Sequence, residues 1–381
     1  MILRLLLIGL WICPALLHAQ EIERRLVLIG DAGEINIKQE MLIPAAAELV
    51  LPGKTTAYFL GDNIYPTGMG LDDSSQLHTA GILQSQFAPF RQRGVPVYFM
   101  AGNHDWDKSG PDGLAKIKAQ EAYIHSLGDS DLRFVPSAGN LGPFVELLTD
   151  SVVTVIYDSE FWLFPHHEAA RSADIAQEKQ QFLETLDSVA KRHREKKLLV
   201  ISHHPMRSYG EHSLRFSASD HIFPLRTLWK GLYIPLPVVG SAYPLLRSTV
   251  FRTAEDLKHP RYRKLIKSVT SVLSNHPRVI YVSGHDHGLQ LIQDGTFTQI
   301  VSGSGAKTSN IRTASDLQYR FGQQGFTVLD FLKDGGAKVS FYIIDKGLVK
   351  KDFEASLGDG KTVKPKEVKQ RDERPVHETQ R

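Results

Sequence analysis

The sequence predicts an α/β fold for most of its 381 residues. Short apolar segments with strand character alternate with longer segments whose apolar residues have helical spacing. Two of the short segments, residues 26–29 and 57–60, are continuous apolar runs, which is typical of strands buried on both faces of a sheet. Residue types that bind metals follow several of these runs directly. In an open α/β sheet, ligands bind at the carboxyl ends of the strands.

The individual elements follow from the same patterns. Three buried strands are expected in the amino-terminal half, at residues 25–30, 57–60 and 95–100, each ending at or just before a glycine. Residues 37–51 predict a helix between the first two strands. The remaining elements are a hairpin at 152–157 and 161–164, a long amphipathic helix at 174–197, and strands at 198–201, 279–282, 289–292, 299–301, 326–332 and 339–344.

The two ends of the chain differ in composition from the middle. Residues 1–19 are typical of a secretory signal peptide, because Arg4 precedes an apolar stretch and a cleavage pattern before Gln20. That stretch is short for a membrane span, and a retained N-terminal anchor is the alternative. Residues 350–381 are charged and predict a disordered tail. Residues 20–349 are expected to form one domain, in which the long irregular stretch 206–260 is an insertion or a lid.

Composition sets limits on location and partners. The hydrophobic share of 42% and the charged share of 23% are those of a soluble globular protein, and the net charge of +3 is too small to indicate nucleic-acid binding. Cys13 is the only cysteine and lies in the predicted signal, so the mature chain would contain no disulfide. Export without disulfides is compatible with a bacterial envelope, and we expect a periplasmic or secreted protein with no stable membrane span.

Five short motifs carry the residues with functional chemistry. They are Gly30-Asp31-Ala32-Gly33, Gly61-Asp62-Asn63-Ile64-Tyr65, Gly102-Asn103-His104-Asp105, Val200-Ile201-Ser202-His203 and Gly284-His285-Asp286-His287. Each motif follows a predicted strand, so the side chains are expected to meet at one edge. Their carboxylates, phenol, amide and imidazoles are enough to hold two metal ions, roughly 3.5–4 Å apart in sites of this kind.

The residue types suggest a role for each position. Asp62 has two oxygen atoms and is the natural bridge between two ions. Asp31, Tyr65 and His287 would hold one ion, and Asn103, His203 and His285 the other. His104 need not bind metal and could donate a proton to a leaving group, with its ring oriented by Asp105. Two paired ions lower the pKa of a bound water and stabilise charge in phosphate ester hydrolysis.

The order of these motifs resembles the calcineurin-like metallophosphoesterases. The finer pattern is similar to the purple acid phosphatases, especially the small tartrate-resistant type. Gly33 stands where the wider superfamily usually has a histidine, and Tyr65 matches the tyrosine of the purple enzymes. The resemblance covers about residues 25–344 and implies a four-layer αββα sandwich, in which two mixed sheets are flanked by helices.

The resemblance also implies metals and roles. Fe(III) would be bound by Asp31, Asp62, Tyr65 and His287, and a divalent ion (Fe, Zn or Mn) by Asp62, Asn103, His203 and His285. The catalytic residues would be His104 and His212, the latter falling where the small type has a histidine near the substrate. The implied protein is an exported acid phosphatase that hydrolyses small phosphomonoesters by attack of a metal-bound hydroxide.

Several alternatives remain open at this point. His204 follows His203 directly where the small type has a tyrosine, so either histidine could be the ligand, although the register with Pro205 favours His203. An exposed loop histidine is the alternative for His212. A Mn- or Zn-dependent phosphodiesterase or nucleotide phosphatase could use the same fold. A protein that binds a partner through the apolar stretch 233–239 is a further alternative.

Overall fold

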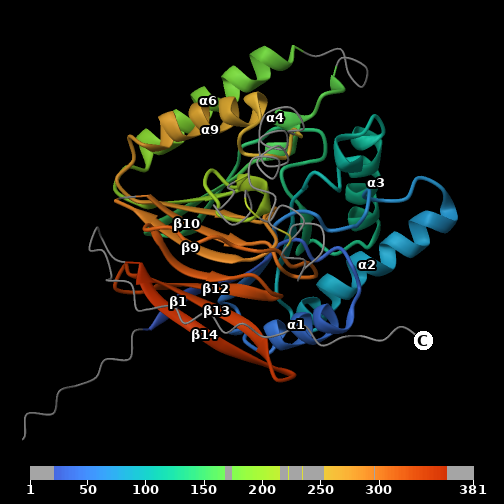
Figure 1. Cartoon of the computed structure of the whole chain (residues 1–381), viewed down its shortest axis with the longest axis horizontal. Coiled ribbons are helices and arrows are strands. Elements are labelled where there is room, and N and C mark those ends of the chain that lie inside the picture. Colours follow the sequence, from blue (N-terminus) through green and yellow to red (C-terminus); the bar gives the residue numbers. More distant parts are fainter. Residues whose placement is uncertain are drawn as a thin grey trace, which may run out of the picture.

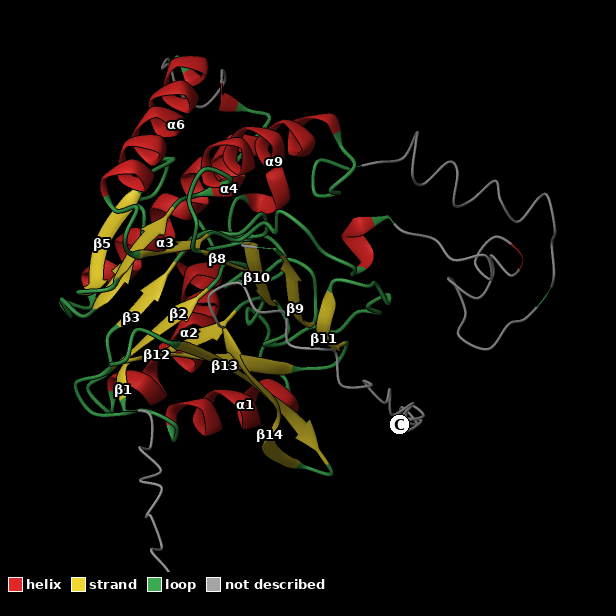
Figure 2. Ribbon diagram, turned by 90° about the vertical axis from the view of Figure 1, so that its left-hand side faces the viewer, coloured by secondary structure: helices red, strands yellow, loops and turns green. Residues whose placement is uncertain are grey.

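The computed structural model shows two facing sheets with helices on their outer sides (Figures 1 and 2). It describes residues 21–167, 174–214, 222, 234, 253–295 and 297–357. Each sheet has seven strands. This arrangement confirms the predicted α/β class with two mixed sheets flanked by helices.

The first sheet has the strand order β14-β13-β12-β1-β2-β3-β4. Strands β1 to β4 are parallel to one another, whereas β12 pairs antiparallel with β1 and begins an antiparallel edge. The bounds are β1 Ile22–Ile29, β2 Thr55–Phe59, β3 Val97–Phe99, β4 Leu132–Phe134, β12 Gly325–Leu332, β13 Ala337–Asp345 and β14 Leu348–Leu357.

The second sheet has the order β11-β9-β10-β8-β7-β6-β5. Strands β6, β7, β8 and β10 are parallel, and the two edges are antiparallel. The bounds are β5 Phe144–Thr149, β6 Val152–Ile156, β7 Lys197–Ile201, β8 Val279–Ser283, β9 Leu289–Asp294, β10 Phe297–Ser302 and β11 Leu317–Phe321.

The continuous apolar runs place one hydrophobic cluster on each face of a sheet. Successive side chains of a strand point to opposite faces. Leu26 and Leu28 of β1 therefore belong to one buried cluster, which also holds Leu199 of β7 and joins the two sheets. Val27 and Ile29 belong to the other cluster, which includes apolar residues of the helices. Because both faces are covered, the central strands show no polar alternation.

The helices cover the outer face of each sheet (Figure 2). Helices α1, α2 and α3 lie on the side of the first sheet, and α4, α6 and α9 on the side of the second. Their bounds are α1 Ile37–Ala47, α2 Asp73–Arg91, α3 Gly113–Ser126, α4 Ser159–Leu163, α6 Ile175–Arg192 and α9 Pro260–Leu273. None of the helices in the described ranges is long and apolar enough to cross a membrane.

Two sequence expectations are wrong. Residues 161–164 do not form a strand, because Asp158 caps a short helix, α4, with a hydrogen bond from Phe161 N to its Oδ1 atom (3.0 Å). The antiparallel partner of β6 is instead β5, which had not been predicted. The charged end of the chain does not become irregular at residue 350, since β14 runs to Leu357 and pairs with β13.

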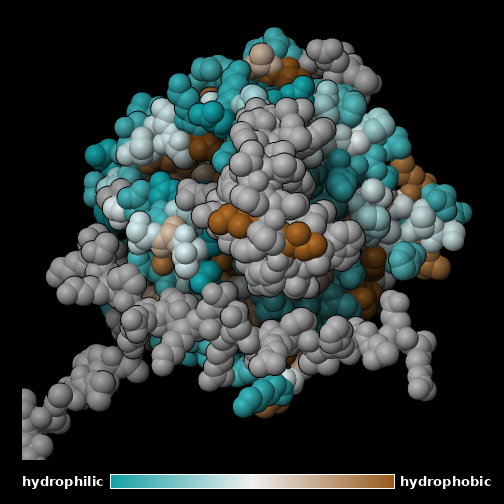
Figure 3. All heavy atoms as spheres, viewed as in Figure 1, coloured by the Kyte–Doolittle hydropathy of each residue, from teal (hydrophilic) through white to brown (hydrophobic). Residues whose placement is uncertain are grey.

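Other expectations fall outside the described residues. These are the signal at 1–19, the rest of the tail from 358, and most of the insertion, including the apolar stretch 233–239 apart from Ile234. On the face in Figure 3, the apolar side chains of the described residues are scattered among polar ones, as is normal for a protein surface.

Candidate metal centre

The five motifs meet at one edge of the two sheets. Asp31, Asp62 and Asn103 lie just after β1, β2 and β3 of the first sheet, and His203 and His285 lie just after β7 and β8 of the second. These five side chains are almost completely buried. The edge is the carboxyl end of the parallel strands, as the sequence predicts.

The glycines in the motifs permit very close packing. A Cβ atom on Gly61 would lie 2.6 Å from Nδ1 of His203, and one on Gly102 would lie 2.3 Å from Oδ1 of Asp62. Asp31 and His285 adopt left-handed backbone angles, with φ of 57° and 69°. Non-glycine residues take such angles at a cost and tend to do so at functional sites. The glycines and the left-handed turns therefore let the side chains of the five motifs approach one another more closely than residues with a Cβ atom at the glycine positions would allow.

Tyr65 joins the first group of predicted ligands. Its hydroxyl lies 3.2 Å from Oδ1 of Asp31, 3.1 Å from Oδ2 of Asp62 and 3.3 Å from Nε2 of His287. Burial, with added repulsion from Asp62, raises the pKa of Asp31 well above its usual range. Burial also raises the pKa of Tyr65 and lowers that of His287 to about 3. Without a cation, burial disfavours the charged forms of Asp31 and Tyr65 and keeps the His287 imidazole neutral.

Asn103 joins the second group. Its Oδ1 atom lies 3.0 Å from Nε2 of His203 and 3.1 Å from Nδ1 of His285. The other nitrogen of each ring faces a backbone carbonyl, Leu60 O at 2.8 Å for His203 and Glu255 O at 2.9 Å for His285. Burial lowers the pKa of both imidazoles, which are therefore neutral and carry one N–H each.

No N–H of Asn103, His203 or His285 points into the space between these three side chains. A carbonyl oxygen can only accept, so each ring donates its single N–H to the backbone. The nitrogens of His203 and His285 that face Asn103 therefore present lone pairs, as does Oδ1 of Asn103. The Asn103 oxygen thus lies 3.0 Å from one ring nitrogen and 3.1 Å from the other. All three buried atoms are acceptors, and no hydrogen lies between them. A metal cation satisfies such a set, so these residues fit a metal ion.

Asp62 faces both groups. Its Oδ1 atom lies 3.5 Å from Nε2 of His203 and accepts the backbone N–H of His104 at 2.8 Å, while Oδ2 is the atom near Tyr65. The two oxygens of one carboxylate are therefore turned to different ligand groups, as a bridge between two ions requires. Asp31, Asp62 and His203 also form a set whose ligand atoms lie close enough to share one ion.

His104 lies at the side of the centre. Its Nδ1 atom is 2.6 Å from the carbonyl oxygen of Pro66, so that ring nitrogen donates to the backbone and Nε2 is turned to Asp62, at 3.9 Å from Oδ2. The expected role of Asp105 is wrong, because its carboxylate accepts backbone N–H groups of Asn63 and Gly102 instead of the His104 ring.

His212 packs behind His285, with ring centres 4.2 Å apart. Its Nδ1 atom lies 3.6 Å from Oδ1 of Asp256. Burial opposes a positive charge there, but the carboxylates of Asp256, Asp286 and Glu255 raise the pKa of His212 to about 9. The side chain is only partly exposed, so it is not a free loop histidine.

The His204 ring lies beside the second ligand group, with its centre 4.4 Å from that of the His285 ring, and its Nδ1 side faces α4. Its Nδ1 atom is 2.9 Å from the Ser159 hydroxyl, and Nε2 is 3.8 Å from Oε2 of Glu160. His203, and not His204, is therefore the one whose nitrogen faces Asn103 and Asp62, although the two rings and His285 lie close together.

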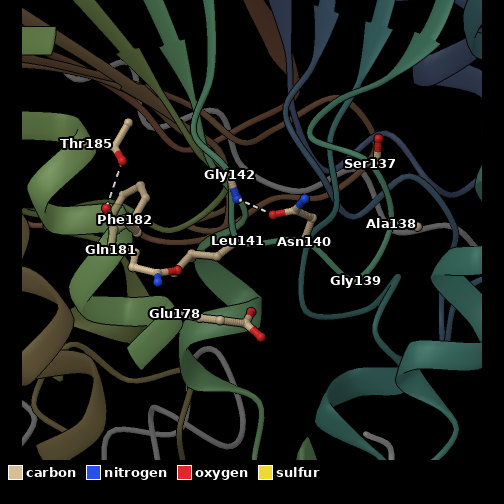
Figure 4. A pocket seen from close by; sticks show the side chains of 10 residues that line it. All are labelled: Ser137, Ala138, Gly139, Asn140, Leu141, Gly142, Glu178, Gln181, Phe182 and Thr185. Carbon is tan, nitrogen blue, oxygen red and sulfur yellow. Dashed lines mark hydrogen bonds between the residues drawn. The ribbon is translucent and has the colours of Figure 1, made fainter. Parts of the chain in front are cut away.

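Three residues near the centre had no signal in the sequence. Glu255 and Asp256 lie at the far end of the predicted insertion, and the Lys307 ammonium lies 4.6 Å from the centre of the Tyr65 ring. All three belong to segments without a recognisable motif. A cavity of about 520 Å³ between the 137–142 loop and α6 contains none of the predicted site residues (Figure 4).

Comparisons with known proteins give several matches to this chain. The sequence model of the calcineurin-like phosphoesterase family matches residues 24–227, more than half of the chain. Tartrate-resistant acid phosphatase type 5 of Rattus norvegicus is 24% identical over 313 residues, and the match covers 79% of each chain. The human protein of the same name is 23% identical over 309 residues, with 79% of this chain and 78% of the relative covered.

Similar solved structures support the fold alone. An anchor in the inner membrane complex of Plasmodium has a TM-score of 0.56 at 16% identity, with 91% of each chain covered. A purple acid phosphatase from yellow lupin seeds has a TM-score of 0.50 at 14% identity, with 88% of this chain and 54% of that chain covered.

Proposed function

Because the chain belongs to the calcineurin-like phosphoesterase family and is therefore a phosphoric ester hydrolase, we propose that it is an exported acid phosphatase acting on phosphomonoesters at a two-metal site. The observation that carries the proposal is the set of lone pairs from Asn103, His203 and His285 that face one another next to the Asp31–Tyr65–His287 group. Relatives named tartrate-resistant acid phosphatase support the monoester class.

Each residue has a part in the proposed reaction. One ion would be held by Asp31, Tyr65 and His287 and the other by Asn103, His203 and His285, with Asp62 shared. When bound, the pair supplies Lewis acidity and a water of lowered pKa. His104 holds a proton at Nε2 and gives it to the leaving oxygen. His212, kept cationic by Asp256, attracts the anionic ester.

Metal analysis and an absorption spectrum on one purified sample test the proposal. We expect about two metal ions per chain and hydrolysis of p-nitrophenyl phosphate at mildly acid pH. Fe(III) on the Tyr65 phenolate would give visible absorbance, which Tyr65→Phe would remove while leaving bound iron measurable. A fully metallated protein without phosphoesterase activity would refute the proposal.

A second candidate keeps the site and changes the ester. Two matches named UDP-2,3-diacylglucosamine hydrolase, from Aeromonas species, cover 14% and 20% of this chain at 44% and 37% identity. Their name, a hydrolase of a UDP-linked substrate, supports the alternative that this chain cleaves phosphodiesters or nucleotides, for which we propose a Mn or Zn pair. A colourless protein that hydrolyses bis(p-nitrophenyl) phosphate faster than the monoester would favour this candidate.

Export is tested separately. We propose that residues 1–19 direct the chain out of the cytoplasm and are then removed. Expression in a bacterium, fractionation and mass measurement should show a periplasmic chain that begins near Gln20. A full-length chain in the membrane fraction would instead support a retained anchor.

A further inference from the structure

We propose that Glu255 is a positioning residue that fixes the side-chain amide of Asn103, so that its oxygen and not its nitrogen faces the metal. The inference rests on the proposed metal site and is independent of the substrate. Glu255 lies at the carboxyl end of the segment predicted as an insertion, far from the motifs in sequence.

Glu255 contacts two predicted ligands with two different groups. Its side-chain Oε1 accepts a hydrogen bond from Nδ2 of Asn103 at 3.1 Å, and its backbone oxygen lies 2.9 Å from Nε2 of His285. One residue therefore determines which atom of Asn103 and which nitrogen of His285 are turned to the centre. A mutation of Glu255 removes only the contact with Asn103, because the contact with His285 is made by the Glu255 backbone oxygen.

The orientation of an amide depends on its hydrogen-bond partners. If the Asn103 amide were turned over, its oxygen would face the Glu255 carboxylate, and two acceptors would meet without a hydrogen. Its nitrogen would then donate toward the lone pairs of His203 and His285 and block them. The Glu255 carboxylate removes this alternative, because a carboxylate can only accept from Asn103. The hydrogen bond to Glu255 also makes the Asn103 amide oxygen a more basic metal ligand, as hydrogen bonds from surrounding residues do for other metal ligands.

The segment that carries Glu255 is itself held in place. The buried Asp256 carboxylate accepts the backbone N–H of Thr253 at 2.8 Å, and Leu257 N donates to the backbone oxygen of His212 at 3.0 Å. Helix α9 begins three residues later, at Pro260. Glu255 is therefore presented from a fixed turn, and its side chain needs little further ordering to reach Asn103.

Metal titration of Glu255→Ala and Glu255→Gln tests this role. Proteins stripped of metal would be titrated with Zn²⁺ and followed by calorimetry and metal content. We expect Glu255→Ala to lower the affinity for one of the two Zn²⁺ ions by roughly 10- to 100-fold, which is the usual effect of losing a residue that supports a metal ligand. The affinity for the other ion should not change. Glu255→Gln, whose amide can turn either way, should give a smaller loss. Glu40→Ala on the exposed surface of α1 is the matched control.

A double-mutant cycle separates positioning from general damage. In an Asn103→Ala background, Glu255→Ala should have no further effect on Zn²⁺ affinity. In an Asn103→Asp background, Glu255→Gln should strengthen binding, because it replaces two facing carboxylates by a carboxylate and a donor. Wild-type affinity for both ions in Glu255→Ala, or additive losses in the cycle, would overturn the inference. A wild-type protein that binds two ions but cleaves no phosphate ester would refute the proposed function alone.

Discussion

At the scale of single residues, the hydrogen bond that each histidine makes to the backbone decides which nitrogen is available to a metal. His203 and His285 both donate to carbonyl oxygens, although they use different ring nitrogens for it. The sequence contains the residue types but not this choice, because the carbonyls of Leu60 and Glu255 come from distant segments. Asp62 is similar, since its two oxygens acquire different partners only when both sheets are in place.

Asp62, which we propose as the bridge between the two ions, should be the most sensitive residue of the centre. Asp62→Asn replaces one carboxylate oxygen by an NH₂ group, which cannot bind a cation. Loss of an outer partner costs up to about 100-fold, so losing a shared ligand should cost more than about 100-fold in metal affinity and in kcat/KM. Metal content and p-nitrophenyl phosphate hydrolysis would measure both effects. Unchanged metal content with full activity would show that Asp62 is not a ligand.

The proton-donor role of His104 can be separated from metal binding. His104→Asn should lower kcat by about 10²- to 10⁴-fold while metal content stays at the wild-type level. The loss should be greater for an alkyl phosphate than for p-nitrophenyl phosphate, because the alkoxide needs the proton more. Equal losses for the two esters would contradict the role.

At the scale of elements, residues 159–163 show how a cap overrides an apolar pattern. Phe161, Trp162 and Leu163 are apolar enough for a buried strand, and all three are buried in α4. Asp158 decides the outcome, because its Oδ1 atom caps the helix and its Oδ2 atom accepts Nε1 of the buried Trp106 at 2.8 Å. The second contact joins α4 to the loop that follows Asn103.

Asp158→Ala should therefore be more costly than the loss of an ordinary cap. A cap is worth about 1 kcal/mol, and the buried indole N–H left without an acceptor adds about 1–3 kcal/mol. We expect a total loss of roughly 2–4 kcal/mol in the free energy of unfolding, measured by urea denaturation. Asp72→Ala, at the exposed cap of α2, is the control and should lose only the cap. Equal losses would show that the Trp106 contact contributes nothing.

At the scale of the whole molecule, the centre connects the two sheets. Asp31, Asp62, Tyr65 and Asn103 follow strands of the first sheet, and the three predicted histidine ligands follow strands of the second. Between the sheets, the contact is otherwise mainly hydrophobic, through the cluster that contains Leu28 and Leu199. An ion bound by both sets of ligands would stabilise the folded state only, since the ligands are brought together by folding.

Removal of metal should therefore lower thermal stability. One ion at 1,000 times its dissociation constant stabilises the folded state by about 4 kcal/mol. For a domain of this size, that corresponds to a fall in Tm of roughly 10 °C on chelation, using about 2–4 °C per kcal/mol. Calorimetry before and after dipicolinate treatment would measure it. The Asp62→Asn protein is the control and should respond much less. An unchanged Tm in the wild type would argue against a site shared by the two sheets.

The sequence by itself determined the fold class, the family and the positions of the central strands. Continuous apolar runs followed by Gly-Asp, Gly-Asn and Gly-His patterns are local signals, and they survive in a single chain because burial and tight turns demand particular residues. Only the tertiary structure decided what depends on distant partners. It placed Asp105 on backbone N–H groups, set Nδ1 of His204 against the Ser159 hydroxyl, and brought Glu255 to Asn103 across 152 positions of the chain. These contacts depend on how segments that are distant in the sequence pack against one another, and no local sequence pattern contains that information.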